Sequence, residues 1–103
     1  MLDTATSATF QPHVGERFDV TPKQGKPFEA VLSSCEETSY GSPDERRQAA
    51  QRVPFSLVFH GPSALPVGQQ MCAFRHPQLG DFDLFIVPLG PDEQGMRYEA
   101  VIS

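Results

Sequence analysis

The three histidines are the first candidates for chemistry, because imidazole serves as both a metal ligand and a general base. They are His13, His60 and His76. If the chain forms an antiparallel hairpin that turns through residues 61–68, His60 lies near the turn and His76 at the far end. At about 3.3 Å per residue, most of a strand length then separates them. His13 belongs to a separate N-terminal segment and can approach only one of the two, so the sequence predicts no metal ligands and singly hydrogen-bonded or solvent-facing histidines instead.

The two cysteines are the next candidates, as nucleophiles or metal ligands. Cys35 and Cys72 fit no metal or redox spacing, and we interpret both as buried thiols rather than as a disulfide. Cys72 and His76 lie on one face of a predicted strand but about 13 Å apart along it, too far for a thiol–imidazole pair. Cys35 could meet a histidine across strands, although nothing in the sequence predicts it.

Carboxylates occur in close pairs, which in some enzymes serve as acid and base. Glu36 and Glu37 are neighbours on a predicted strand and therefore point to opposite faces. Asp81 and Asp83 share a face, which we interpret as a solvated polar face with Asp83 paired across strands to Arg75 or Arg97. No glycine-rich phosphate loop occurs, so the sequence predicts no catalytic or cofactor-binding residues, no cofactor, and a protein that is not an enzyme.

Size and charge limit the remaining functions. The 103 residues are expected to form one domain, 1–103, with the eight phenylalanines supplying most of its core. A formal net charge of −5 disfavours nucleic acid as a partner. No apolar run approaches the roughly 20 residues of a membrane span, and the N-terminus lacks the pattern of a signal peptide, so a cytoplasmic location is expected.

The first half of the chain predicts a short helical turn followed by a hairpin. The turn is expected within residues 7–15, capped by Ser7, with Phe10 and Val14 facing the core as a lid. Strands are predicted at 17–21 and 28–37, the second with Phe28, Ala30, Leu32 and Ser34 on one face. Residues 38–54 are polar and predict a long loop.

The second half predicts four more strands, at residues 55–60, 69–75, 81–88 and 96–102. Their short connections favour a four-stranded antiparallel meander. Residues 84–87 are apolar on both faces, which predicts a strand covered on both sides. The fold class is therefore all-β, with about six antiparallel strands in a small barrel or a two-layer sandwich. We favour the barrel because closure removes exposed edges.

Several stretches of the second half resemble a family of short, uncharacterised bacterial proteins that carry a domain of unknown function. These stretches are residues 55–59, 61–62, 76–80, 84–91 and 95–101. The N-terminal third, with Phe10 and a Gly15-x-x-Phe18 element, is similar more loosely. The resemblance implies a loose association with tail-collar-type proteins of phage tails and tail-like particles, and it implies no chemistry.

These observations predict a small, non-catalytic interaction or accessory module that docks on a protein partner or associates with itself. An exposed apolar or aromatic patch should then remain on the folded surface. The last strand, 96–102, is expected to offer a free edge for pairing with a second chain. The alternative is a β-barrel that binds a small ligand inside, which eight phenylalanines in so short a chain disfavour.

Overall fold

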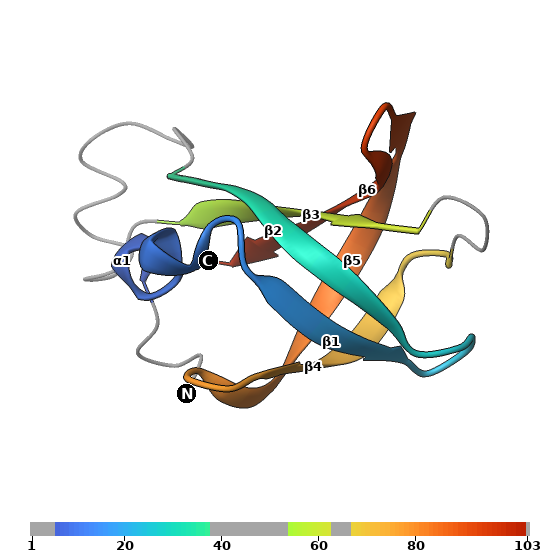
Figure 1. Cartoon of the computed structure of the whole chain (residues 1–103), viewed down its shortest axis with the longest axis horizontal. Helices are drawn as coiled ribbons and strands as arrows, with labels where there is room; N and C mark the ends of the chain where they lie inside the picture. The colour runs from blue at the N-terminus through green and yellow to red at the C-terminus, as the bar shows by residue number, and fades with distance from the viewer. Residues whose placement is uncertain (1–5, 38–53, 63–66, 103) are drawn as a thin grey trace.

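The fold is described by a computed structural model, which covers residues 6–37, 54–62 and 67–102. A four-residue helix and a 3-10 turn begin the described chain, α1 (Ser7–Phe10) and η1 (Gln11–His13). The strands of the described residues are β1 (Arg17–Pro22), β2 (Phe28–Glu37), β3 (Phe55–Gly61), β4 (Gln70–His76), β5 (Gly80–Asp92) and β6 (Gly95–Ile102). They close into an antiparallel barrel in the order β1-β2-β3-β6-β5-β4 (Figure 1). The all-β prediction is confirmed, and the architecture is the barrel rather than the sandwich.

The predicted four-stranded meander is wrong at its first step. β3 pairs with β2 and β6, whereas β4 pairs with β1 and β5. Of the four strands predicted to form the meander, only β4, β5 and β6 are therefore successive neighbours in the sheet. A short connection excludes a parallel crossover, but it does not require two successive strands to be neighbours. We derived the separation of His60 and His76 from a hairpin between these two strands, and because they do not pair, that derivation does not apply.

The expected free edge on the last strand is also wrong. β6 pairs with β3 from Phe55 opposite Ile102 to Gly61 opposite Met96, and β5 lies along its other side. Closure of the barrel thus uses the edge that a second chain would need for strand addition.

Phenylalanine fills the barrel, as predicted. The buried members are Phe10, Phe18, Phe55, Phe59, Phe74 and Phe82, and Phe28 packs partly buried against them. The rings contact one another inside the barrel, with the centroids of Phe59 and Phe74 at 4.9 Å and those of Phe74 and Phe82 at 5.7 Å. Phe85 is the exception, since 48% of its surface is exposed.

A bulge changes the inward face of β2 part of the way along the strand. Leu32 lies opposite Phe59 and Ser34 opposite Val58, so Ser33 is the extra residue. The predicted alternation holds up to Leu32, but after the bulge Cys35 points inward, where the sequence had placed Ser34. Alternation in a sequence cannot reveal such an insertion.

The N-terminal helical segment covers one end of the barrel, as the predicted lid does (Figure 1). Phe10 is fully buried against Phe55 and Phe82. Two details differ from the prediction: the N-cap is Thr6 rather than Ser7, and Val14 is 37% exposed. The predicted loop at 38–54 falls, apart from its last residue, outside the described residues. No helix of the described ranges is long and apolar enough to cross a membrane.

Candidate functional site

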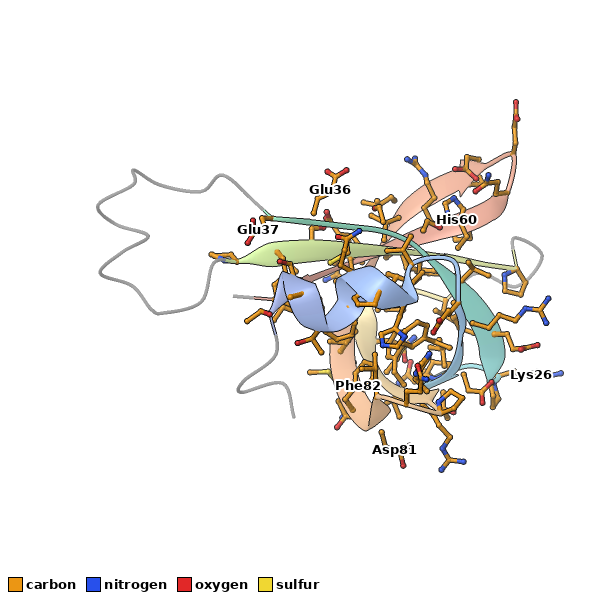
Figure 2. The ribbon with its side chains drawn as sticks, turned by 60° about the vertical axis from the view of Figure 1, so that its left-hand side comes forward. Lys26, Glu36, Glu37, His60, Asp81 and Phe82 are labelled. Atoms are coloured by element: carbon orange, nitrogen blue, oxygen red, sulfur yellow. The ribbon has the colours of Figure 1, made fainter. Side chains whose placement is uncertain are left out.

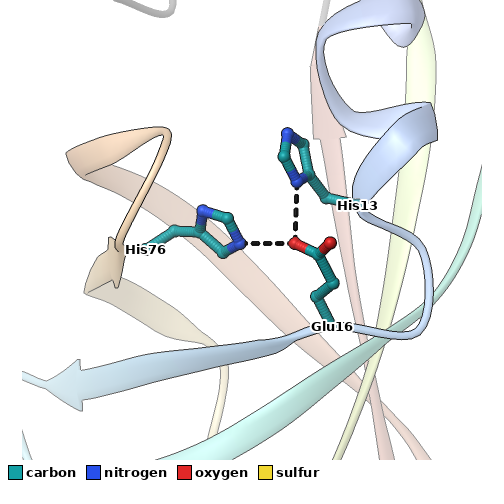
Figure 3. A group of neighbouring side chains, drawn as sticks. All are labelled: His13, Glu16 and His76. Carbon is teal, nitrogen blue, oxygen red and sulfur yellow. Dashed lines mark hydrogen bonds and ion pairs between the residues drawn. The ribbon is translucent and has the colours of Figure 1, made fainter.

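A carboxylate lies between two histidines where the N-terminal segment meets the end of β4 (Figure 3). Glu16 Oε1 is 2.7 Å from His13 Nδ1 and 2.7 Å from His76 Nε2. His13 belongs to η1, and His76 ends β4 at the turn into β5. The His76 side chain is only 4% exposed, and its ring centroid lies 4.6 Å from that of Phe18. The group therefore joins the lid to the β4–β5 turn at the edge of the core.

The hydrogen bonds of His76 determine which ring nitrogen carries the proton. The backbone N–H groups of Gln78 and Leu79 donate to its Nδ1, at 3.1 and 3.2 Å. Nδ1 is therefore the acceptor, and Nε2 carries the hydrogen that is donated to Glu16. The hydrogen bonds from His13 and then His76 lower the pKa of the Glu16 carboxyl, because they stabilise its charged form.

This tautomer argues against a metal centre at the same three residues. Their ligand atoms lie within 4.8 Å of one another, and two imidazoles with a carboxylate are common metal ligands. A metal on His76 Nε2 would move the proton to Nδ1, where it would face the N–H groups of Gln78 and Leu79. Metal-binding histidines usually donate their second N–H to an oxygen instead. The arrangement is better suited to a hydrogen-bonded clamp between two parts of the fold.

Sequence reasoning found only part of this cluster. It placed His13 within reach of a single other histidine, and in the structure that residue is His76, with ring centroids 4.7 Å apart. It missed Glu16, the residue that connects the two rings. The available indication was local, because Glu16 follows His13 by three residues and directly precedes β1.

A second polar chain joins the β2 bulge to the β5–β6 hairpin. His60 Nε2 lies 2.8 Å from Asp92 Oδ2, and His60 Nδ1 hydrogen-bonds to the Ser33 hydroxyl. Figure 2 shows His60 beside this hairpin. The hydrogen bond from His60 contributes most to lowering the pKa of Asp92. Sequence reasoning did not bring these three residues together, because the bulge that exposes Ser33 to His60 is invisible in the sequence.

Serine, histidine and aspartate also form nucleophile relays in hydrolases. Such a site needs donors for an oxyanion and a cleft for the substrate beside the hydroxyl. Ser33 lines neither of the two grooves that the structure describes around its strands. We therefore interpret this chain of hydrogen bonds as an attachment of the hairpin to the barrel wall.

The thiols are poorly placed for nucleophilic chemistry. Both cysteines are buried and free. Burial raises the pKa of Cys35, with a further contribution from the charge of Glu37, and raises the pKa of Cys72 to about 11. At neutral pH both side chains are thus almost entirely protonated, the unreactive form.

The outer face of β4, β5 and β6 carries a row of exposed apolar side chains. Met71 lies opposite Phe85 across β4 and β5. β5 pairs with β6 as far as Val87 opposite Glu99, and Val101 follows Glu99 by two residues on the outer face of β6. Met71, Phe85 and Val101 are 40, 48 and 47% exposed. We call these three residues the apolar row.

The apolar row corrects the prediction that residues 84–87 form a strand covered on both sides. The inward residues Leu84 and Ile86 are buried, but Phe85 between them is half exposed, and no described residue covers it. Two apolar faces on a strand can mean burial on both sides, or burial on one side and a surface that binds something else. In the structure this strand is buried on its inner side only.

A groove adjoins the apolar row on the side of β1. It has a volume of about 330 Å³ and runs across the outer face of β1, β4 and β5. Its outward-facing lining is Asp19, Thr21, Ala73, Arg75, Asp81 and Asp83. In Figure 2 Asp81 points away from the barrel, whereas the next residue, Phe82, points inward. The groove is therefore part of the barrel surface, and the filled interior lies beneath it.

The charged residues of this groove have different partners from those that the sequence predicts. Asp81 and Asp83 do share a face, as predicted. Arg75, however, lies opposite Asp81 and donates to it from Nε at 3.1 Å, whereas Asp83 lies opposite Ala73. Arg97 donates to the backbone carbonyls of residues 89 and 90. The register across the strands, which the sequence does not specify, decides these partners.

Comparison with known proteins gives a family and no activity. No curated protein and no solved structure matches the chain. Residues 5–102, nearly the whole chain, match a family described as a domain of unknown function, DUF6916. The family's description assigns no chemistry to any residue, which leaves the barrel surface as the guide to function. The chain belongs to this family, DUF6916.

Proposed function

We propose that this protein is a non-catalytic interaction module that binds a protein partner through the apolar row. The observation that carries the proposal is that the exposed side chains of Met71 and Phe85 lie opposite each other on β4 and β5, with the exposed Val101 on the neighbouring strand β6. Isolated apolar residues are ordinary on protein surfaces, whereas adjacent large ones are typical of binding sites. Aromatic residues and methionine are also enriched in the cores of protein interfaces.

The alternative, a small ligand inside the barrel, has less support. The interior is occupied by phenylalanine rings that contact one another, as in Phe59, Phe74 and Phe82. A ligand of ordinary size would need several of these rings to move out of a packed core, which costs several kcal/mol per large side chain. The described grooves lie on the outside of the barrel, where a protein surface can reach them.

An enzymatic function has less support as well. The histidine with the least exposed side chain, His76, has both ring nitrogens engaged in hydrogen bonds, and the thiols are protonated at neutral pH. A partner in a phage-tail-like system agrees with the resemblance of residues 55–101 to companions of tail-collar-type proteins. In that setting the module would act as an accessory protein of the bacterial cytoplasm.

The experiment is affinity capture of the tagged protein from its native host, compared with the variants Phe85→Ser and Val14→Ser. Val14 is a matched control, because it is an exposed apolar side chain on the lid, away from the apolar row. We expect a stoichiometric partner with the wild type and Val14→Ser, and its loss with Phe85→Ser. Recovery of the same partner with all three proteins would contradict the proposal.

A further inference from the structure

We infer that the partner carries a lysine or arginine next to its apolar contact, and that this side chain enters the groove beside the apolar row. The inference rests on the proposed function and specifies the chemistry of the partner. It is drawn from the order of side chains on the outer face of β5 and its neighbours. Three observations support it: continuity of the surface, the shape of the groove and its charge.

The apolar row and the groove form one continuous surface. Outward positions on a strand are two residues apart, about 6.6 Å, so Phe85, Asp83 and Asp81 follow one another along β5. Opposite them on β4 lie Met71, Ala73 and Arg75 in the same order. A partner segment that rests an apolar side chain on Phe85 therefore has its neighbouring side chain within reach of Asp83.

Ala73 gives the groove its shape. It is the one short side chain between two long ones on the outer face of β4, with Met71 on one side and Arg75 on the other. On β1, Thr21 lies opposite Ala73 and adds little bulk. The hollow of about 330 Å³ over this small residue is open to solvent and wide enough for a long side chain.

The charge of the groove selects a cation. Three carboxylates line it, those of Asp19, Asp81 and Asp83, against the single guanidinium of Arg75. Arg75 already pairs with Asp81, and among the residues that the structure describes neither Asp19 nor Asp83 has an ion-pair partner. The formal charge of the whole chain is −5, which adds a longer-range attraction for a basic partner.

The same charges disfavour a second copy of this chain as the occupant. Two copies related by a twofold axis would meet through the same surface. Asp83, and Glu99 two residues before Val101, would then bring carboxylates of both copies to the margin of the same contact. Like charges at the margin of an interface oppose association, whereas a basic margin on a different protein favours it.

The test uses two short peptides of serine and glycine that contain one leucine and, two residues later, either arginine or citrulline. Citrulline has nearly the shape of arginine without its charge. Binding to the full chain is followed by NMR through the methyl groups of Met71, Ala73 and Val101. Variants Asp83→Asn and Phe85→Ser test the two parts of the surface, and Glu93→Gln is the control that removes a charge at the exposed tip of the β5–β6 hairpin.

We expect the arginine peptide to bind at least about threefold more tightly than the citrulline peptide, the size of effect known for exposed ion pairs. Asp83→Asn should remove this difference, Phe85→Ser should weaken both peptides, and Glu93→Gln should leave binding unchanged. Added salt should reduce the preference for arginine.

Other outcomes separate the inference from the proposed function. Equal binding of both peptides, or no binding at millimolar concentration, overturns the inference but leaves partner capture through Phe85 intact. A concentration-dependent dimer that is lost in Phe85→Ser, seen by sedimentation, overturns it in favour of a second copy. Capture of the same partner by the wild type and by Phe85→Ser contradicts the proposed function itself.

Discussion

Replacing His76 by leucine tests whether this residue is a structural clamp. Leucine keeps an apolar side chain of similar size against Phe18 but removes the acceptor for the N–H groups of Gln78 and Leu79. The substitution also removes the hydrogen bond from His76 Nε2 to Glu16, so three lost hydrogen bonds of about 1 kcal/mol each should lower the free energy of unfolding by about 3 kcal/mol. For a domain of this size that corresponds to a fall in Tm of roughly 15 °C.

The assay combines urea unfolding with amide hydrogen exchange, because the exchange rates locate the effect. In His76→Leu the amides of Gln78 and Leu79 should exchange faster than in the wild type. The variant His76→Asn supplies an amide oxygen that can accept the same bonds, as asparagine does in turns. It should keep these two amides protected even where it loses packing against Phe18.

The reasoning is refuted if His76→Leu leaves the exchange of both amides unchanged, or lowers stability by less than about 0.5 kcal/mol, half of one typical hydrogen bond. Tight binding of zinc by the wild type, with release of a proton and loss in Glu16→Gln, would refute the tautomer assignment separately.

Three further predictions concern other parts of the account. Gly95→Ala should destabilise the protein more than Gly90→Ala in urea unfolding: both glycines have positive φ, but only at position 95 would the new Cβ meet the carbonyl oxygen of Gly61. Equal effects would count against the close approach of β3 and β6 there. Because the folded state lowers the pKa of Glu16, its contribution to stability is present above the pKa of the unfolded chain and lost as the pH falls through the lower folded value. Unfolding free energies measured from pH 7 down to pH 3 should therefore fall less steeply in Glu16→Gln, and parallel curves would exclude this linkage. A fluorophosphonate probe should leave the protein unlabelled, as judged by intact mass, whereas an adduct on Ser33 would show that the chain of hydrogen bonds through His60 activates a nucleophile.

Much of the fold follows from local sequence patterns, and most of what was missed depends on contacts between strands. Alternation in residues 17–21 and 55–60 predicts β1 and β3 nearly to their ends, because one face of each strand is buried. The neighbours of β3 in the sheet could not be predicted, since a short loop does not determine which strands pair. The bulge at Ser33 is a second example, because an extra residue shifts the inward face without changing the composition.

The sequence indicates that residues 84–87 are apolar on both faces. It could not determine whether the outer of these faces is buried under a second layer or exposed to solvent. Phe85 is expected to be buried wherever a second layer covers the strand, and exposed wherever the fold is a single closed sheet. The decision depends on the architecture of the whole barrel. The partners of Arg75 likewise depend on register, which pairs it with Asp81 and leaves Asp83 opposite Ala73.

The most direct test of the central claim is a methyl NMR titration of the labelled protein with its purified partner. Met71 and Val101 report from the apolar row, and Met96, packed against the core near the β5–β6 turn, is the internal control. The account predicts that the signals of Met71 and Val101 shift or broaden on binding while that of Met96 does not, and that Phe85→Ser abolishes the response. A partner that binds tightly without affecting Met71 and Val101, or that binds Phe85→Ser equally well, would contradict it.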